Sequence, residues 1–352
     1  MSALPYIDGP VLERLVPVGR AVAVLEQALR DGLDPELTPR RPTVDLPAGQ
    51  LLLMPAAAGR YAGVKAVTVT PDNPGRGLPR IQGTYLLLDG PTLAPLAALD
   101  GIALTSLRTP AVSALAVAHL AEPDARRLVV FGSGPQAYGH VLALREVRPV
   151  EHVTVVGRDP ARAAALAARC RALGLTAESL TAGAPTAGAP TAEAATAEAP
   201  TAEAPTAEAL TAEALTAEAA AVPGAVADAI RAADLVACCT TAAQPLFPGK
   251  LARDGVTVVA VGSHEPGVRE LDGDLVARAT VVVEARSAAL EEAGDVIIPI
   301  RHGTITSGHL AGNLAELIAG RVVAGPGPRV FKSTGMAWQD LVVAAAAYEA
   351  WK

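Results

Sequence analysis

The chain has 352 residues, of which 51% are hydrophobic and 3% aromatic, and its net charge at neutral pH is −7. A chain of this length can bury a large core and is expected to form two domains. Six glutamates between residues 181 and 220 account for all but one unit of the net charge. Neither the basic surface of a nucleic-acid-binding protein nor a polybasic membrane patch is therefore predicted.

Several other classes of protein are disfavoured. No run of 18 or more consecutive apolar residues predicts a transmembrane helix, and the start, MSALPYIDGPVLER, lacks the basic and apolar regions of a secretory signal. Cys170, Cys238 and Cys239 form no disulfide framework, and the six histidines have no recognised metal-ligand spacing. We therefore expect a cytoplasmic protein with reduced thiols, no metal, and no nucleic-acid or membrane partner.

The first 120 residues predict helices on either side of a sheet. Residues 10–32 have apolar side chains at helical spacing around Pro17, which predicts two short helices. Residues 33–100 contain short apolar runs between prolines and glycines, which predict mainly antiparallel strands. Thr109 as an N-cap and Pro110 at the first helical position then predict a helix that ends near Leu120.

The most informative stretch is LVVFGSGPQA, residues 128–137. An apolar strand leads into G-x-G-x-x-A, and a helix-compatible run follows. The first glycine permits a tight turn, the second lets a pyrophosphate approach the backbone, and the alanine lets the helix pack on the strand. Free amides at the helix N-terminus attract phosphate. We therefore assign dinucleotide binding to Gly132, Ser133, Gly134, Pro135, Gln136 and Ala137. Thr109, outside this loop, is a further predicted cofactor-binding residue.

The next strand (153–156) and helix (160–173) bear on the choice of dinucleotide. An acidic residue at the end of this strand would bind the ribose hydroxyls and favour NAD. Arg158 stands there instead, and an arginine can contact the 2′-phosphate of NADP. Asp159 is expected to cap the following helix. The sequence favours NADP and leaves NAD possible.

Residues 181–220 are eight copies of a five-residue unit, T-A-x-A-x. The period matches neither helix nor strand, prolines interrupt it, and large apolar side chains are almost absent. Such a segment cannot bury enough surface to offset its ordering entropy. We expect a disordered acidic insertion in a surface loop, without a role in catalysis.

The remaining chain resumes the alternation of helix and strand. A helix at 224–232 and strands at 234–240, 256–262 and 280–284 predict a parallel α/β sheet. The tail predicts two more helices, 309–320 and 336–351, that pack back towards the N-terminal region.

Seven motifs, in this order, resemble the ornithine cyclodeaminase/μ-crystallin family. They are GVKAVTVTPDNPGRGLP (63–79), GTYLLLDGPT (83–92), LTSLRTPAVSALA (104–116), VVFGSGPQA (129–137), VGSHEPGVRELD (261–272), LAELIAGR (314–321) and VFKSTGMAWQDL (330–341). The resemblance implies an α/β fold in which a Rossmann-type domain (116–309), carrying the 181–220 insertion, interrupts an α+β substrate and dimerisation domain. That second domain would combine residues 1–115 with 310–352, and the protein would be a homodimer.

The resemblance also implies the substrate-binding residues. Arg41, Lys65 and Arg108 match residues that hold the substrate carboxylate and the reacting nitrogen. The chemistry agrees, because a guanidinium binds a carboxylate through two hydrogen bonds and a lysine can protonate a developing amine. Asp340 and Lys332, in the last motif, either lie near the active site or hold the tail in place, and the second role is favoured.

Three departures from the family pattern narrow the function. The resemblance implies that cyclodeaminases have a catalytic aspartate at the position of His264 and a glutamate at the position of Gln50. It also implies a threonine at the position of Arg80. Loss of two carboxylates argues against ring closure from ornithine. We therefore expect an NAD(P)-dependent oxidoreductase, an imino-acid (ketimine) reductase or amino-acid dehydrogenase, with Lys65 and His264 as its catalytic residues.

Other hypotheses about the function stay open at this point. One is an ornithine cyclodeaminase that makes proline with catalytic NAD. Others are a non-catalytic protein that binds a small molecule together with NADPH, and an amino-acid-condensing synthase. The sequence does not identify the side chain of the substrate.

Overall fold

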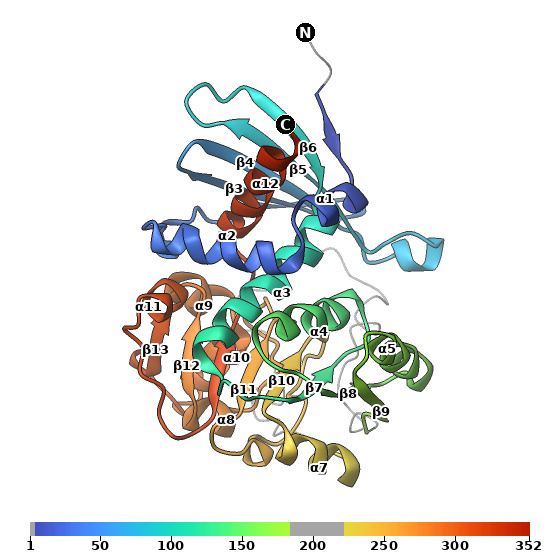
Figure 1. Cartoon of the computed structure of the whole chain (residues 1–352). Helices are drawn as coiled ribbons and strands as arrows, with labels where there is room; N and C mark the ends of the chain where they lie inside the picture. The colour runs from blue at the N-terminus through green and yellow to red at the C-terminus, as the bar shows by residue number, and fades with distance from the viewer. Residues whose placement is uncertain (1–3, 184–221) are drawn as a thin grey trace. The chain divides into compact units, whose positions relative to one another are not determined.

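The computed structural model describes residues 4–183 and 222–352, so the repeat of 181–220 lies almost wholly outside the described residues. The chain divides into two compact units, which we describe separately (Figure 1). Unit 1 contains Met1–Leu115 and Gly335–Lys352, and unit 2 contains Ala116–Thr334.

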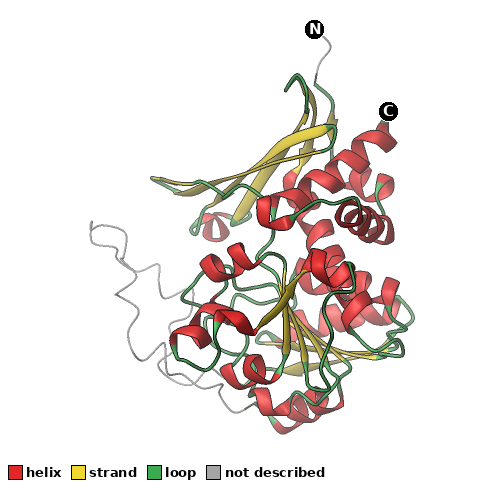
Figure 2. Ribbon diagram, turned by 90° about the vertical axis from the view of Figure 1, so that its left-hand side faces the viewer, coloured by secondary structure: helices red, strands yellow, loops and turns green. Residues whose placement is uncertain are grey.

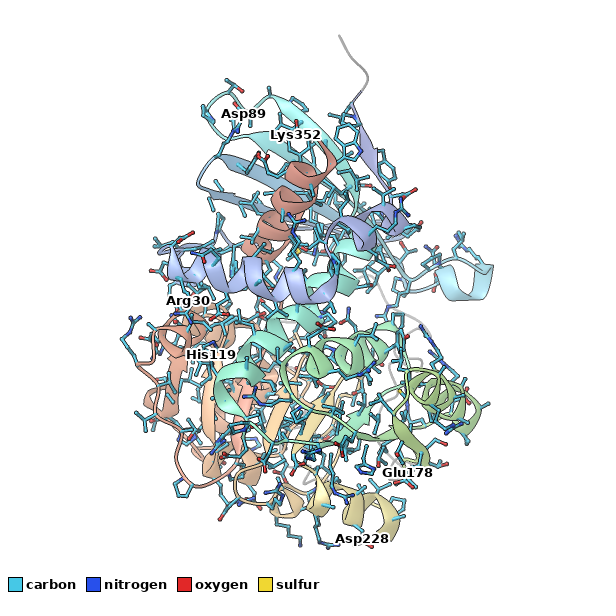
Figure 3. The ribbon with its side chains drawn as sticks, viewed as in Figure 1. Arg30, Asp89, His119, Glu178, Asp228 and Lys352 are labelled. Carbon is cyan, nitrogen blue, oxygen red and sulfur yellow. The ribbon has the colours of Figure 1, made fainter. Side chains whose placement is uncertain are left out.

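After the two-residue strand β1 (Tyr6–Ile7), unit 1 contains the two helices that the sequence predicts. They are α1 (Gly9–Leu15), capped by Asp8, and α2 (Val18–Arg30), which starts after Pro17. The buried side chains of α2 recur at helical spacing, and at its exposed end Arg30 pairs with Glu26 one turn earlier (Figure 3). Two short 3-10 turns follow, η1 (Pro35–Leu37) and η2 (Asn73–Arg76).

Helix α3 (Gly101–Leu120) starts eight residues before the predicted N-cap. The Asp100 carboxylate accepts hydrogen bonds from the backbone N–H groups of Ile102 and Ala103, at 2.9 and 3.0 Å, and so caps the helix there. Pro110 therefore lies inside the helix, and the prediction of a start at Thr109 is wrong. A proline inside a helix is destabilising, and burial of the apolar side chains of α3 provides the free energy that offsets this cost at Pro110.

Among the residues that the structure describes, α3 is the one helix long and apolar enough to cross a membrane. Of its most apolar window, 67% is buried inside the protein, as expected for a core helix. The last turn of the helix contains His119, whose side chain is exposed (Figure 3).

A six-stranded sheet forms the core of unit 1, in the order β1-β6-β5-β4-β3-β2. The strands are β1 (Tyr6–Ile7), β2 (Thr43–Leu46), β3 (Gly49–Ala58), β4 (Tyr61–Val69), β5 (Ile81–Asp89) and β6 (Pro95–Asp100). All pairs are antiparallel except β1 with β6, in agreement with the sequence. The register aligns Met54, Lys65 and Tyr85 across three strands, on one face of the sheet.

The C-terminal helix α12 (Ala337–Trp351) covers that face. It packs on β3, β4 and β5 and against α2, and Figure 2 shows these helices on one side of the sheet. The side chains of the other face alternate with the buried ones and include Leu51, Leu53, Val64, Leu86 and Leu88, all partly exposed. One face of this sheet is therefore a core, and the other is an apolar surface.

Unit 2 is built on an eight-stranded parallel sheet in the order β13-β12-β14-β11-β10-β7-β8-β9. The strands are β7 (Arg127–Phe131), β8 (His152–Gly157), β9 (Thr176–Thr181), β10 (Leu235–Cys238), β11 (Thr257–Ala260), β12 (Thr280–Val283), β13 (Leu310–Asn313) and β14 (Arg329–Lys332). The helices are α4 (Pro135–Val147), α5 (Pro160–Ala172), α7 (Gly224–Ala232), α8 (Gly273–Arg278), α9 (Arg286–Glu292), α10 (Gly294–Arg301) and α11 (Leu314–Ile318), with 3-10 turns η4 (Gly249–Leu251) and η5 (Ser307–His309).

The strand order confirms the α/β fold and marks where a ligand binds. From β9 to β11 the sheet follows the first five strands of the Rossmann order, 3-2-1-4-5, and the direction of winding reverses between β7 and β10. In such sheets the ligand lies beyond the carboxyl ends of the strands at that reversal. The glycine loop follows β7 directly.

The tail departs from the sequence prediction. The predicted helix 309–320 is instead β13 followed by α11, which begins with a capping box between Asn313 and Glu316. Strand β14 then pairs with β11 and β12 inside the second sheet. Residues 310–334 therefore belong to unit 2, and the chain returns to unit 1 only at Gly335, not at 310. A buried strand of four residues has no periodicity by which a sequence could separate it from a helix.

Candidate active site

Lys65, at the middle of β4, lies in a buried cluster of charged side chains in unit 1. Its ammonium forms an ion pair with the Asp340 carboxylate of α12 at 2.8 Å, and its side chain is only 2% exposed. It also donates to the Thr105 hydroxyl of α3 at 3.0 Å. Since that hydroxyl donates in turn to the Gly101 carbonyl, it is the acceptor for Lys65.

Arg108, one turn further along α3, contacts the same carboxylate. Its Nε donates to Asp340 Oδ1 at 3.2 Å and its Nη1 to Gln339 Oε1 at 2.9 Å. Gly335 has a φ of +79°, and a Cβ atom at that position would lie 2.7 Å from Nη1 of Arg108. The left-handed backbone at Gly335 favours glycine, and any side chain there would push against this guanidinium. Two cations thus share one carboxylate, which leaves the cluster with a net positive charge.

The surroundings of Lys65 bring the pKa of its ammonium closer to neutral pH. Burial lowers the pKa of Lys65 to about 8, and the positive charges of Arg108 and Arg41 act in the same direction. The Asp340 carboxylate opposes these effects. Tyr85, opposite Lys65 on β5, has its pKa raised by burial and by Asp340, so its hydroxyl stays neutral.

The predicted substrate-binding residues are all in unit 1. Lys65 and Arg108 meet at Asp340, and the half-buried Arg41 is close enough for its charge to act on Lys65. Gln50 is exposed on β3, where its amide donates to Asp45 at 3.0 Å. Their roles toward a substrate stay predictions.

Two predicted positions are exposed. His264 follows β11 in unit 2, and Arg80 precedes β5 in unit 1. A catalytic role for His264 stays a prediction. Among the described side chains, no group of three or more His, Cys, Asp or Glu residues is arranged to hold a metal ion.

Sequence reasoning missed the part that Asp340 and Gln339 take in the cluster. Of the two roles that the sequence leaves open for Asp340, holding the tail is the favoured one, yet its carboxylate contacts both Lys65 and Arg108. A signal was present, because both polar residues stand among Trp338, Leu341 and Val343 in the mainly apolar first half of the helix. A carboxylate at such a position is rarely buried unless it is paired.

In unit 2, the glycine loop has the geometry that a dinucleotide requires. Gly132 follows β7 with a φ of +110°, and a Cβ there would lie 2.5 Å from the Cys239 carbonyl oxygen. Gly134 is the N-cap of α4 and offers no side-chain cap, and a Cβ there would meet no atom within 4 Å. Ala137 is fully buried in the helix behind them. Uncapped amides and open space beside Gly134 fit a pyrophosphate.

The other cofactor residues are less enclosed. Ser133 and Gln136 are half-buried, and Pro135 is exposed at the start of α4. Arg158 is exposed directly after β8, and Asp159 caps α5 by accepting from the N–H groups of Ala161 and Arg162, as predicted. Thr109 is buried in α3, in unit 1. Binding of a cofactor by these residues stays a prediction.

Two glycine substitutions separate cofactor binding from folding. Gly134→Asp is expected to weaken NADPH binding at least about 100-fold, since a carboxylate would face the pyrophosphate. Its stability should be kept or raised, because aspartate is a favoured N-cap and the backbone there is extended. Gly132→Ala should instead destabilise the fold by at least about 1–3 kcal/mol through its positive φ and the contact with Cys239.

Fluorescence titration with NADPH and thermal unfolding distinguish the two effects. Retained NADPH affinity in Gly134→Asp would contradict the placement of the phosphates at this loop.

Comparison with known proteins identifies a family and similar structures. The family model for ornithine cyclodeaminase/mu-crystallin matches residues 22–217 and 198–352. The Δ1-pyrroline-2-carboxylate reductase of Bacillus cereus is 34% identical over 85% of this chain and 80% of its own length. The Δ1-pyrroline-2-carboxylate/Δ1-piperideine-2-carboxylate reductase of Azospirillum brasilense is 31% identical over 99% of this chain and 97% of its own.

Solved structures agree over nearly the whole chain. The Δ1-pyrroline-2-carboxylate reductase of Thermococcus litoralis, in complex with NADH and L-proline, has a TM-score of 0.80 and 27% identity, covering 99% of this chain and 97% of that one. An archaeal alanine dehydrogenase dimer with bound NAD has a TM-score of 0.80 and 25% identity, covering 99% and 95%.

Proposed function

The chain belongs to the ornithine cyclodeaminase/mu-crystallin family, whose reductases use a nicotinamide dinucleotide, and from this premise we propose that it reduces cyclic imino acids. The substrates are five- and six-membered rings with a carboxylate beside the C=N bond, Δ1-pyrroline-2-carboxylate and Δ1-piperideine-2-carboxylate. The buried cluster of Lys65, Arg108 and Asp340 carries this proposal, since it offers a carboxylate-binding guanidinium beside a proton donor.

We infer a role in the reaction for each group of this cluster. Asp340 and Gln339 use two of the five donors of the Arg108 guanidinium, and the other three can bind the carboxylate of the substrate. A nicotinamide dinucleotide, held at the glycine loop by Gly132, Gly134 and Ala137, would supply the hydride for the imine carbon. As that C–H bond forms, the π electrons of the C=N bond pass to nitrogen, which takes a proton from Lys65. The product is the saturated cyclic amino acid.

Two positions favour reduction over cyclodeamination. Abstraction of a proton and ring closure from ornithine would use carboxylates, whereas this chain has Gln50 and His264 at the matching positions. The Gln50 amide is moreover exposed and hydrogen-bonded to Asp45.

NADPH is the proposed reductant. The exposed guanidinium of Arg158 ends the second strand of the Rossmann order, where a 2′-phosphate would lie. The neighbouring Asp159 carboxylate caps α5 by accepting two backbone hydrogen bonds. It is therefore not proposed as the acidic residue that binds the ribose hydroxyls in NAD sites.

A homodimer is proposed as well. The uncovered face of the unit 1 sheet carries Leu51, Leu53, Val64, Leu86 and Leu88, partly exposed in the single chain. Contiguous apolar surface of this kind marks an interaction site, and a second copy would bury it.

The test is oxidation of NADPH by the purified protein with each cyclic imine, with NADH in parallel. Turnover that favours NADPH is the expected result. Formation of proline and ammonia from ornithine with NAD, and no turnover of either imine, would overturn the proposal in favour of a cyclodeaminase.

Arg158→Ala is expected to raise the KM for NADPH at least about tenfold and to leave the KM for NADH unchanged, because a charge-assisted contact contributes about 1.5–3 kcal/mol. Arg231→Ala, an exposed arginine of α7 that pairs with Asp228, serves as the matched control. An equal change with both cofactors would contradict a role in binding the 2′-phosphate.

A further inference from the structure

Asp340 is fully buried, and each of its carboxylate oxygens faces a different cation. Oδ2 is 2.8 Å from Lys65 Nζ, and Oδ1 accepts from Arg108 Nε at 3.2 Å. The three residues come from α12, β4 and α3, and Asp340 is the one carboxylate among the described residues that contacts both Lys65 and Arg108. The negative charge of the buried Asp340 carboxylate offsets the repulsion between the positive charges of Lys65 and Arg108.

The first consequence concerns the charge of Lys65. Burial and the positive charges of Arg108 and Arg41 all favour the neutral amine. Thr105 is an uncharged acceptor, and the Tyr85 hydroxyl stays neutral. Of the groups that face Lys65, Asp340 is the one whose charge favours the ammonium.

The second consequence concerns the orientation of Arg108. Asp340 holds Nε, and Gln339 Oε1 accepts from Nη1 while it also accepts from the Met336 N–H at 3.3 Å. Gly335 closes one side of the guanidinium. Both hydrogens of Nη2 and one of Nη1 are left by these contacts, which defines the edge that can meet a carboxylate.

We propose that Asp340 is the positioning residue of this site: it keeps Lys65 protonated for donation to the imine nitrogen and, together with Gln339, turns Arg108 to receive the substrate carboxylate. With Asp340 present, the cluster carries one net positive charge, which a single carboxylate neutralises. The inference rests on the proposed reductase function. It adds Asp340 as the residue whose two carboxylate oxygens serve the proton donor, Lys65, and the carboxylate-binding Arg108.

The test measures binding as well as turnover. Pyrrole-2-carboxylate, a flat ring acid that cannot be reduced at a C=N bond, is titrated by calorimetry between pH 6 and pH 10 into wild type, Asp340→Asn and Thr105→Val. Wild-type affinity is expected to fall as pH rises through about 8, where Lys65 loses its proton. In Asp340→Asn this fall should move at least one pH unit lower, whereas Thr105→Val, which removes the uncharged acceptor, should move it by less than half a unit.

Each outcome decides a separate question. A fall at the same pH in Asp340→Asn and wild type would overturn the inference, even if both proteins reduce the imines. Wild type that binds pyrrole-2-carboxylate with the expected pH dependence and reduces neither imine would instead overturn the proposed reaction and leave the role of Asp340 standing.

Thermal unfolding and NADPH binding establish that Asp340→Asn is folded. If it is not, Asp340→Glu carries the test, because it keeps the charge and displaces the carboxylate by one methylene. A pH dependence like that of wild type with an affinity at least tenfold weaker supports the inference, and no change in either overturns it. Gln339→Leu should weaken binding without moving the pH dependence.

Discussion

Replacement of Lys65 by methionine is expected to lower kcat for imine reduction by about 10²- to 10⁴-fold, the usual contribution of a positioned proton donor. Methionine fills a similar volume but has no proton to give. NADPH binding should be unchanged, since the glycine loop and Arg158 belong to unit 2. Stopped-flow measurement of NADPH oxidation, with fluorescence titration of the cofactor, separates the two quantities.

The pH profile adds a second readout for Lys65. The acid form of the lysine is the active one, so wild-type kcat should fall as pH rises through about 8, the value to which burial lowers the pKa of Lys65. The residual activity of Lys65→Met should lack that fall. Lys65→Arg is the matched control, because it keeps the positive charge but holds its proton too strongly to release it. Activity within tenfold of wild type in both variants would exclude Lys65 as the proton donor.

Replacement of Arg108 by lysine is expected to raise the KM for the cyclic imino acid by about 10- to 100-fold. A lysine keeps the charge but not the planar set of donors that fits a carboxylate, and each hydrogen bond to a charged group contributes about 1.5–3 kcal/mol. Gln339 Oε1, which is buried, would also lose its guanidinium partner. Steady-state kinetics with both imines checks this prediction.

A change of substrate provides the control. With Δ1-pyrroline-2-carboxamide, which has no charged carboxylate, wild type and Arg108→Lys should differ by much less than they do with the acid. An equal loss for acid and amide would show that the substitution damages the site in general. Arg108→Ala is less informative, since removal of one member of a buried ionic group destabilises a protein by about 3–5 kcal/mol.

Much of this protein follows from short-range features of its sequence. The strand and glycine loop at 128–137 predict a dinucleotide fold because turn, phosphate contact and helix packing all depend on neighbouring residues. The break between α1 and α2 at Pro17 and the cap at Asp159 follow from equally local chemistry. Lys65 and Arg108 could be named because each stands inside a motif that the chain shares with its family.

Other features are decided by contacts between distant parts of the chain. The sequence placed the start of α3 at Thr109, whereas Asp100 caps it and burial tolerates Pro110 inside it. It also read 309–320 as one helix, although Leu310–Asn313 becomes an edge strand of the parallel sheet. A strand of only four residues, here Leu-Ala-Gly-Asn, shows no periodicity that distinguishes it from a helical turn before a neighbouring strand is present.

The clearest case is Asp340. It is separated from Arg108 by 232 positions and from Lys65 by still more, and no local pattern reports that α12 returns to the sheet face that carries them. The sequence by itself determined the two chemical parts, a dinucleotide loop and a pair of cations in family motifs. Only the tertiary structure placed a buried carboxylate between those cations, because the electrostatic balance of a buried group depends on every charge that folding brings near it.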